Sequence, residues 1–125
     1  MSRAARFAWV GAGGFVVQVA ALHAFAAAGI PYAFATALAV EVAILHNFLW
    51  HERWTWRDRR AGVRSRLRRL GRFHLLNGSV SLAGNLVLMR LLVGELGVPH
   101  LAANVCAVVA CSLINFYGSD RLVFD

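Results

Sequence analysis

The hydrophobic residues of this chain gather in four long runs separated by short polar stretches. The runs cover residues 7–28, 32–50, 73–94 and 99–118. About 20 consecutive apolar residues in a helix are enough to cross the hydrocarbon core of a bilayer. The pattern therefore predicts an all-α membrane protein with four transmembrane helices.

The polar residues that flank these runs occur as two copies of one pattern. An Arg-Phe pair opens the first and third runs, and an Asn-Phe pair followed by an arginine, six residues after the Asn, closes the second and fourth. The two copies are Arg6-Phe7 with Asn47-Phe48 and Arg53, and Arg72-Phe73 with Asn115-Phe116 and Arg121. Because each copy holds an even number of spans, we predict two parallel two-helix repeats. Repeat 1 covers residues 6–57 and repeat 2 residues 72–125; with the basic loop 51–72 they form a single membrane domain, 1–125.

The charge is distributed unevenly along the chain. The chain is 59% hydrophobic and 15% charged, with a net charge of +7, and all 13 of its basic residues are arginine. Nine arginines lie between Arg53 and Arg72, whereas the turns around Gly29 and Gly97 contain none. Positive residues favour the cytoplasmic side of a membrane. We therefore expect cytoplasmic termini, a cytoplasmic central loop and outward-facing turns, and no nucleic-acid partner.

Small residues recur every four positions in the second and fourth runs. The stripes are Ala35, Ala39, Ala43 and Asn47, and Ala103, Ala107, Cys111 and Asn115. Such spacing places each stripe on one helix face, where small side chains let two backbones approach closely. We predict a packing seam along which the second and fourth helices, or helices of two subunits, meet.

Several polar residues lie at depth in the predicted membrane spans. They are Gln18, His23, Glu41, Asn85 and Arg90. Burying such groups in lipid is costly, so each requires a partner or a purpose. One interpretation pairs Glu41 with Arg90 and lets the amides hold the helices together. The other is a hydrophilic crevice through which a polar headgroup passes. The chain shows no catalytic triad and no phosphate-binding glycine loop, so we expect neither an enzyme nor a cofactor or metal.

The pattern of four short spans, Arg-Phe starts and an Asn-Phe…Arg-Trp-Thr-aromatic box resembles the GtrA-like family of small bacterial membrane proteins. The box is Asn47-Phe48 followed by Arg53-Trp54-Thr55-Trp56, with Trp56 where the family usually has Phe. The resemblance implies a protein of the bacterial cytoplasmic membrane that flips a polyprenyl-phosphate-linked monosaccharide for polysaccharide glycosylation. It also leaves open an anchor that recruits a glycosyltransferase partner. A small proton-coupled multidrug exporter is a third class. In those exporters the intramembrane acidic residue lies on the first helix, whereas here Glu41 lies in the second predicted span.

The two box arginines are the strongest candidates for binding the lipid phosphate. Arg53 and Arg121 each lie just beyond a membrane helix, and a guanidinium binds phosphate through two parallel hydrogen bonds. Trp54 and Trp56 are expected to flank the same site, with Asn47 and Asn115 beside it. Interfacial anchoring by Arg and Trp is the alternative. Because four thin helices leave little room for a headgroup, we also expect a homodimer or a complex with a transferase.

Overall fold

The structure is a computed structural model that describes residues 1–59 and 62–124, with only the backbone described at Asn85. Its long helices are α1 (Arg3–Ala27), α2 (Tyr32–Trp50), α3 (Val63–Met89) and α4 (His100–Gly118). All four are long and apolar enough to cross a membrane, and no strand occurs in the described ranges. The predicted all-α fold with four membrane-spanning helices is confirmed.

Three of these helices continue into a widened π-helical turn. The turns are η1 (His51–Thr55) after α2, η3 (Arg90–Glu95) after α3 and η4 (Ser119–Val123) after α4, and a short 3₁₀ turn, η2 (Arg57–Arg59), follows η1. Repeat 2 has two more residues between its Arg-Phe start and its turn glycine than repeat 1 has. These residues fall in the stretch that contains η3, whereas α1 ends without a π-helical turn.

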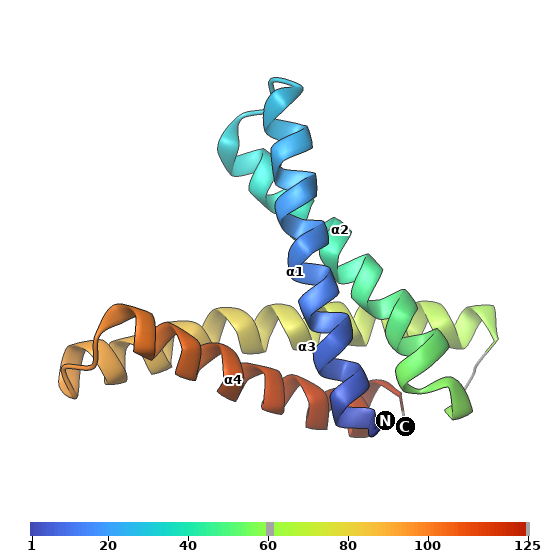
Figure 1. Ribbon diagram of the computed structural model, residues 1–125. Coiled ribbons are helices and arrows are strands. Elements are labelled where there is room, and N and C mark those ends of the chain that lie inside the picture. The colour runs from blue at the N-terminus through green and yellow to red at the C-terminus, as the bar shows by residue number, and fades with distance from the viewer. Residues whose placement is uncertain (60–61, 125) are drawn as a thin grey trace. The chain divides into compact units, whose positions relative to one another are not determined.

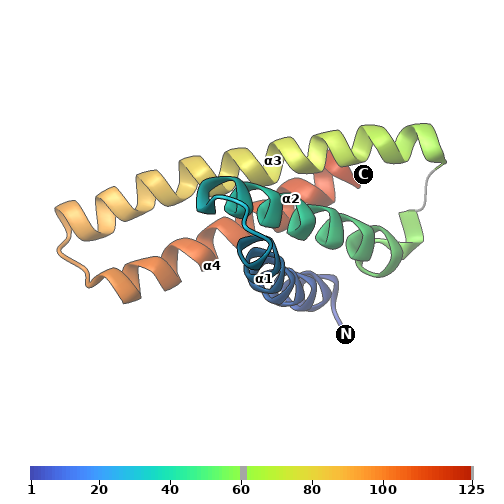
Figure 2. The same ribbon diagram turned by 90° about the horizontal axis from the view of Figure 1, so that it is seen from above.

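The chain forms two compact units, Met1–Gly62 and Val63–Asp125. Unit 1 is a helical hairpin of α1 and α2, coloured blue to green in Figure 1. Unit 2 is a hairpin of α3 and α4, coloured yellow to red, and the view from above in Figure 2 shows the two helices of each hairpin side by side. Each unit contains one of the two predicted repeats.

The starts and turns of the helices follow from a few local residues. Ser2 caps α1, because its hydroxyl accepts a hydrogen bond from the amide of Ala5 at 3.1 Å. Proline precedes the first residue of both α2 and α4, where its missing N–H costs no helical hydrogen bond. The hairpin turns need Gly29 (φ 86°) and Gly97 (φ 67°), since a residue with a Cβ rarely adopts a positive φ.

The alanine stripes pack against the other helix of their own unit. Ala35 and Ala39 are buried on α2, and a Cβ at Gly14 of α1 would fall 2.7 Å from the Cγ of Asn47. In unit 2, a Cβ at Gly84 of α3 would fall 2.6 Å from the Sγ of Cys111. The stripe faces, which were predicted to meet each other or a second subunit, are therefore occupied by α1 and α3.

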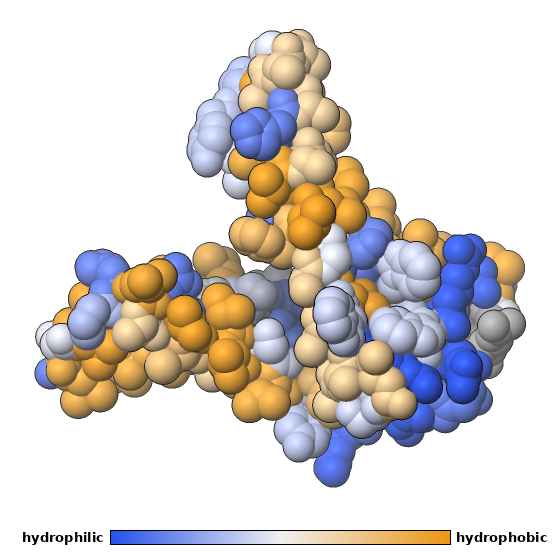
Figure 3. Space-filling view, in the orientation of Figure 1, coloured by the Kyte–Doolittle hydropathy of each residue, from blue (hydrophilic) through white to orange (hydrophobic). Residues whose placement is uncertain are grey.

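The basic segment between the units is more helical than predicted. The sequence predicts a basic loop over 51–72, but α3 begins at Val63, so the arginines from Arg64 to Arg72 lie on its first turns. The stems of the hairpins are largely orange in Figure 3, and the strongest blue lies at their arginine-bearing ends. An apolar stem between polar ends suits a chain that crosses a bilayer.

Candidate functional site: paired grooves at the repeated arginine boxes

The first box is folded around the π-helical turn η1. The amide of Trp56 donates to the carbonyl of His51 at 2.8 Å, a bond that spans five residues and closes the turn. Trp56 is 0% exposed and Thr55 1% exposed, whereas Arg53 lies exposed on the outside of the turn. The turn therefore buries the aromatic end of the box and leaves its arginine open to solvent or lipid headgroups.

Phe7 of α1 holds this turn in place. Its ring stacks on His51 with centroids 4.5 Å apart and meets Trp56 edge-on at 6.0 Å. His51 is also joined to the hydroxyl of Thr55, with 3.0 Å between Nδ1 and Oγ1. The Arg-Phe start of the repeat thus supplies the ring on which the box packs.

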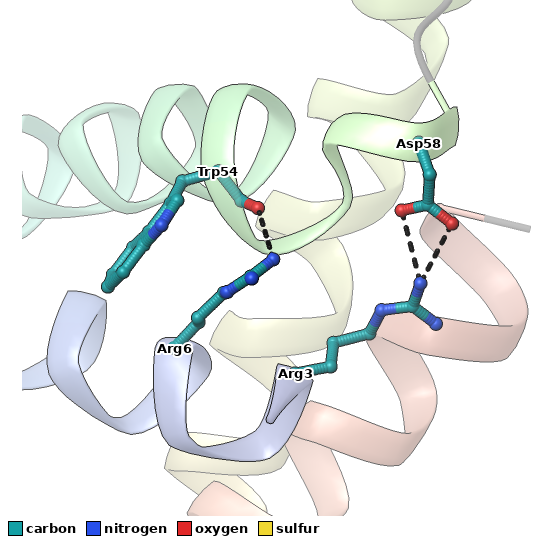
Figure 4. A network of polar contacts seen from close by, with 4 residues as sticks. All are labelled: Arg3, Arg6, Trp54 and Asp58. Atoms are coloured by element: carbon teal, nitrogen blue, oxygen red, sulfur yellow. Dashed lines mark hydrogen bonds and ion pairs between the residues drawn. The ribbon is translucent and has the colours of Figure 1, made fainter. Parts of the chain in front are cut away.

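Arginines of α1 bind the backbone and side chains beyond α2 (Figure 4). Arg6 donates from Nη1 to the carbonyl of Trp54 at 3.4 Å, and its guanidinium lies 5.8 Å from the centre of the Trp54 ring. Arg3 donates to both carboxylate oxygens of Asp58, at 2.9 and 3.1 Å. A backbone hydrogen bond at Asp58, together with the charge of Arg3, holds the pKa of the Asp58 carboxyl below its ordinary value.

The second box repeats this arrangement with simpler side chains. The amide of Phe124 donates to the carbonyl of Ser119 at 2.8 Å and closes η4, and the Phe124 ring packs on Phe73 with centroids 6.2 Å apart. Arg72 donates to the carbonyl of Leu122 at 3.3 Å, as Arg6 does to Trp54. Equivalent residues in the two units therefore make equivalent contacts.

A groove lies beside each box arginine, within its own unit. Groove 1 has a volume of about 550 Å³ and is lined by Met1, Trp9, Val10, Gly13, His46, Trp50, Arg53 and Trp54. Groove 2 has a volume of about 520 Å³ and is lined by Arg72, Leu75, Leu76, Ser79, Arg121, Leu122 and Val123. Five positions are repeat equivalents, running from Trp9 and Leu75 to Arg53 and Arg121. Groove 1 is aromatic where groove 2 is aliphatic.

Residues 6–124 match the family described as GtrA/DPMS, transmembrane domain. The chain belongs to the GtrA/DPMS transmembrane-domain family. It is also similar to a dolichol-phosphate mannosyltransferase from Pyrococcus furiosus, with 37% identity over 109 residues, or 87% of this chain. The chain spans 30% of that relative's length. The predicted likeness to the GtrA-like family is confirmed, and the chain is a multi-pass membrane protein.

Not every box residue reaches a groove of this GtrA/DPMS domain. Arg53, Trp54 and Arg121 line the grooves, but Trp56 is enclosed by its own turn and by Phe7. The expectation that the Trp56 indole flanks a ligand is therefore corrected, since a fully buried ring cannot present its face. In the first box, Trp54 lines groove 1, whereas Trp56 packs in the interior of unit 1.

The amides of the two boxes are packing residues. Asn47 lies against Gly14 and is joined to the Nδ1 of His46, with 3.2 Å between Nδ1 and Oδ1. Asn115 is 7% exposed, and its Oδ1 has no hydrogen-bond partner within the described ranges. Both asparagines were predicted to lie beside the site. They are near the box arginines in sequence, but neither lines groove 1 or groove 2.

The polar residues at depth are divided between the units. On α1, Gln18 is half-buried and His23 exposed, and on α2 Glu41 is exposed. Arg90 is exposed at the end of α3, where it lines a groove of unit 2, and the side chain of Asn85 lies outside the described residues. The Glu41–Arg90 pair and the hydrophilic crevice both stay predictions.

Sequence reasoning missed Trp9, His46 and Trp50 as groove residues. Each lies inside a predicted span, where an aromatic ring is expected in lipid or in packing. The repeat is a signal for Trp9, because Trp9 and Leu75 occupy equivalent positions after the two Arg-Phe pairs and both line a groove. His46 and Trp50 lie two turns and one turn before Arg53, but their equivalents, Ile114 and Gly118, do not line groove 2.

Proposed function

We propose that this protein translocates a polyprenyl-phosphate-linked monosaccharide across the cytoplasmic membrane for the glycosylation of cell-surface polysaccharide. The observation that carries the proposal is the pair of equivalent grooves, each with an exposed arginine beside an apolar wall. A polyprenyl-phosphate sugar combines a charged phosphodiester, a sugar and a long apolar chain. Each groove offers a binding surface for these parts.

Arg53 and Arg121 act as the phosphate ligands in this proposal. A guanidinium gives two parallel N–H donors to phosphate oxygens and keeps its charge at physiological pH. Arg6 and Arg72 donate to backbone carbonyls and so fix the turns on which the two box arginines lie. On the topology that the arginines predict, both grooves face the inner leaflet, where the sugar-charged lipid is made.

The different walls of the grooves suggest a division of labour. Groove 1 carries Trp9, Trp50 and Trp54, and indole faces suit the apolar face of a sugar ring. Groove 2 carries Leu75, Leu76 and Leu122, which suit the isoprenoid chain. We therefore expect groove 1 to favour the sugar part of a lipid bound there, and groove 2 the isoprenoid part of a lipid bound there.

The relative supports the substrate class. Its name, dolichol-phosphate mannosyltransferase, combines a polyprenyl phosphate with a sugar. The shared segment is membrane-spanning in this chain, and it is a minor part of that longer protein. This second fact also favours another function, in which the domain anchors or recruits a glycosyltransferase without moving lipid.

Reconstitution separates the two functions. Vesicles that contain the purified chain and a polyprenyl-phosphate sugar are treated with a membrane-impermeant reagent that consumes the sugar in the outer leaflet. We expect the inner pool to become accessible with the chain and to stay protected in protein-free vesicles. An inner pool that stays protected, together with release of a transferase from cell membranes when the chain is deleted, would establish the anchor instead.

A further inference from the structure

A third groove lies at the turn end of unit 2, away from either box. It has a volume of about 670 Å³ and is lined by Leu86, Val87, Met89, Arg90, Val93, Gly94 and His100. Arg90 begins the π-helical turn η3 and His100 begins α4, so two adjacent elements each contribute a polar side chain to one apolar groove. We call this the turn groove.

The arginines of groove 2 and the turn groove lie about one membrane thickness apart along α3. Arg72 lines groove 2, and Arg90 lines the turn groove 18 residues later, along the continuous helix α3 and the start of η3. At 1.5 Å per residue that is about 27 Å, close to the roughly 30 Å of a bilayer's hydrocarbon core. The two arginines therefore lie near opposite ends of the predicted membrane span.

Arg90 is costly where it lies unless an anion neutralises it. Charged residues within membrane spans are rare, and most of them either pair with a counter-charge or line the pathway of a ligand or ion. Within the described part of the chain, no hydrogen bond or ion pair engages its guanidinium. A cationic side chain set in apolar walls has the charge pattern that an anionic lipid requires.

The repeat provides an internal comparison. The positions in unit 1 that correspond to Arg90 and His100 are Ala24 and Tyr32, neither of which is cationic. Unit 1 also lacks the π-helical turn that carries Arg90 in unit 2. Such turns inside helices are frequent at functional sites. The turn end of unit 2 therefore carries a cation and a widened turn that the equivalent described positions of unit 1 lack.

We propose that the turn groove binds the phosphate of a polyprenyl-phosphate lipid at the membrane face opposite the boxes. Arg90 holds the phosphate oxygens through its two N–H donors, His100 donates a further hydrogen bond, and Leu86, Val87 and Val93 receive the first isoprene units. The direction of travel rests on the proposed translocation: the boxes load the lipid and the turn groove receives it. Binding at the turn groove is a separate claim with its own test.

The test uses a photoreactive short-chain prenyl phosphate and the matching prenyl alcohol, which lacks the phosphate. The full chain in lipid nanodiscs is irradiated with each probe, and labelled peptides are located by mass spectrometry. We expect the phosphate probe to label residues 86–100 as well as the box segments, and the alcohol probe to label 86–100 far less. Arg90→Gln should lower labelling of 86–100 about tenfold and leave the boxes labelled.

Matched variants keep the test decisive. Arg68→Gln removes the same charge from an exposed position at the other end of α3 and should leave labelling of 86–100 unchanged. His100→Ala gives a second, milder loss. Equal labelling of 86–100 by the two probes, or by Arg90→Gln and the wild type, overturns the turn groove. Loss of phosphate-dependent labelling at the boxes alone would overturn the proposed function instead.

Competition identifies the source of the phosphate. Unlabelled prenyl phosphate should displace the probe from residues 86–100, whereas inorganic phosphate and phosphatidylglycerol at the same concentration should not. Displacement by inorganic phosphate would make this a free-anion site. Displacement by phosphatidylglycerol would make it a general lipid contact. Either result would contradict the assignment to polyprenyl phosphate.

Discussion

Gly14 of α1 faces Asn47 of the first box without room for a Cβ, so Gly14→Ala should loosen unit 1. A Cβ there would lie 2.7 Å from both the Cγ and the Nδ2 of Asn47, closer than unstrained heavy atoms pack. The Asn47 amide would have to move, and its 3.2 Å contact with His46 would be lost. Displacement of the Asn47 side chain would also shift His46 and so disturb groove 1, which His46 lines.

The magnitude follows from three contributions. Overpacking of a tight contact costs about 1–3 kcal/mol, and a lost hydrogen bond adds about 1 kcal/mol. Alanine is about 0.8–1.0 kcal/mol better than glycine inside a helix, which offsets part of this cost. We therefore expect Gly14→Ala to lower the free energy of unfolding by about 1–3 kcal/mol.

Gly11→Ala is the matched control. Gly11 lies one turn earlier on the same helix, and a Cβ there would meet nothing within 4 Å. The control should be neutral or slightly stabilising. Unfolding is followed by tryptophan fluorescence during denaturing-detergent titration of the full chain, because all four tryptophans lie in unit 1. Equal midpoints for the Gly14 and Gly11 variants would refute the close contact.

Three further predictions concern the first box, the topology and the charged residues within the predicted spans. Phe7→Ala removes the ring that packs the first box and should destabilise unit 1 by about 3 kcal/mol in the same titration; Phe73→Ala, in unit 2, should leave the tryptophan signal unchanged. A cysteine replacing Gly97 should react with an impermeant thiol reagent from outside the cell, and labelling only from the cytoplasm would reverse the topology. Glu41→Gln and Arg90→Gln should be additive in stability, whereas a coupling above about 0.5 kcal/mol would indicate an ion pair.

The membrane spans were predictable because lipid imposes a simple rule on sequence. The apolar run 32–50 coincides with α2, and the predicted turn glycines Gly29 and Gly97 both have a positive φ. Helices have to satisfy their own backbone groups in lipid, so a long apolar run has few alternatives to a helix. The repeated Arg-Phe and Asn-Phe pairs likewise occupy equivalent places in their units.

The sequence alone could not predict which helix packs against each alanine stripe. A stripe such as Ala35 and Ala39 shows that some backbone approaches closely, but the small residues that receive it sit elsewhere, at Gly14 and Gly84. Glycines are scattered along α1, and only Gly14 faces Asn47. Spacing identifies a contact face without identifying its neighbour.

The π-helical turns also escaped prediction, and they decide the site. A regular helix through the first box would continue the helical periodicity, which gives no reason for Trp56 to be enclosed while Arg53 is exposed. The widened turn η1 changes that register and folds Trp56 onto Phe7. The same change at η4 places Phe124 on Phe73 and leaves Arg121 in its groove. Hydrophobic periodicity does not reveal a change of helical register of this kind.

The measurement that tests the central claim most directly is sugar-lipid translocation by lysine variants of the box arginines. Lysine keeps the charge of Arg53 and Arg121 but cannot form the two parallel hydrogen bonds of a guanidinium with phosphate. The control pair, Arg57→Lys with Arg68→Lys, makes the same change at exposed positions outside the grooves. We expect the double box variant to insert normally and to lose about tenfold or more in the rate of outer-leaflet exposure of the sugar, with the control pair unchanged. Full translocation by the double box variant would contradict the claim and leave both arginines as interfacial anchors.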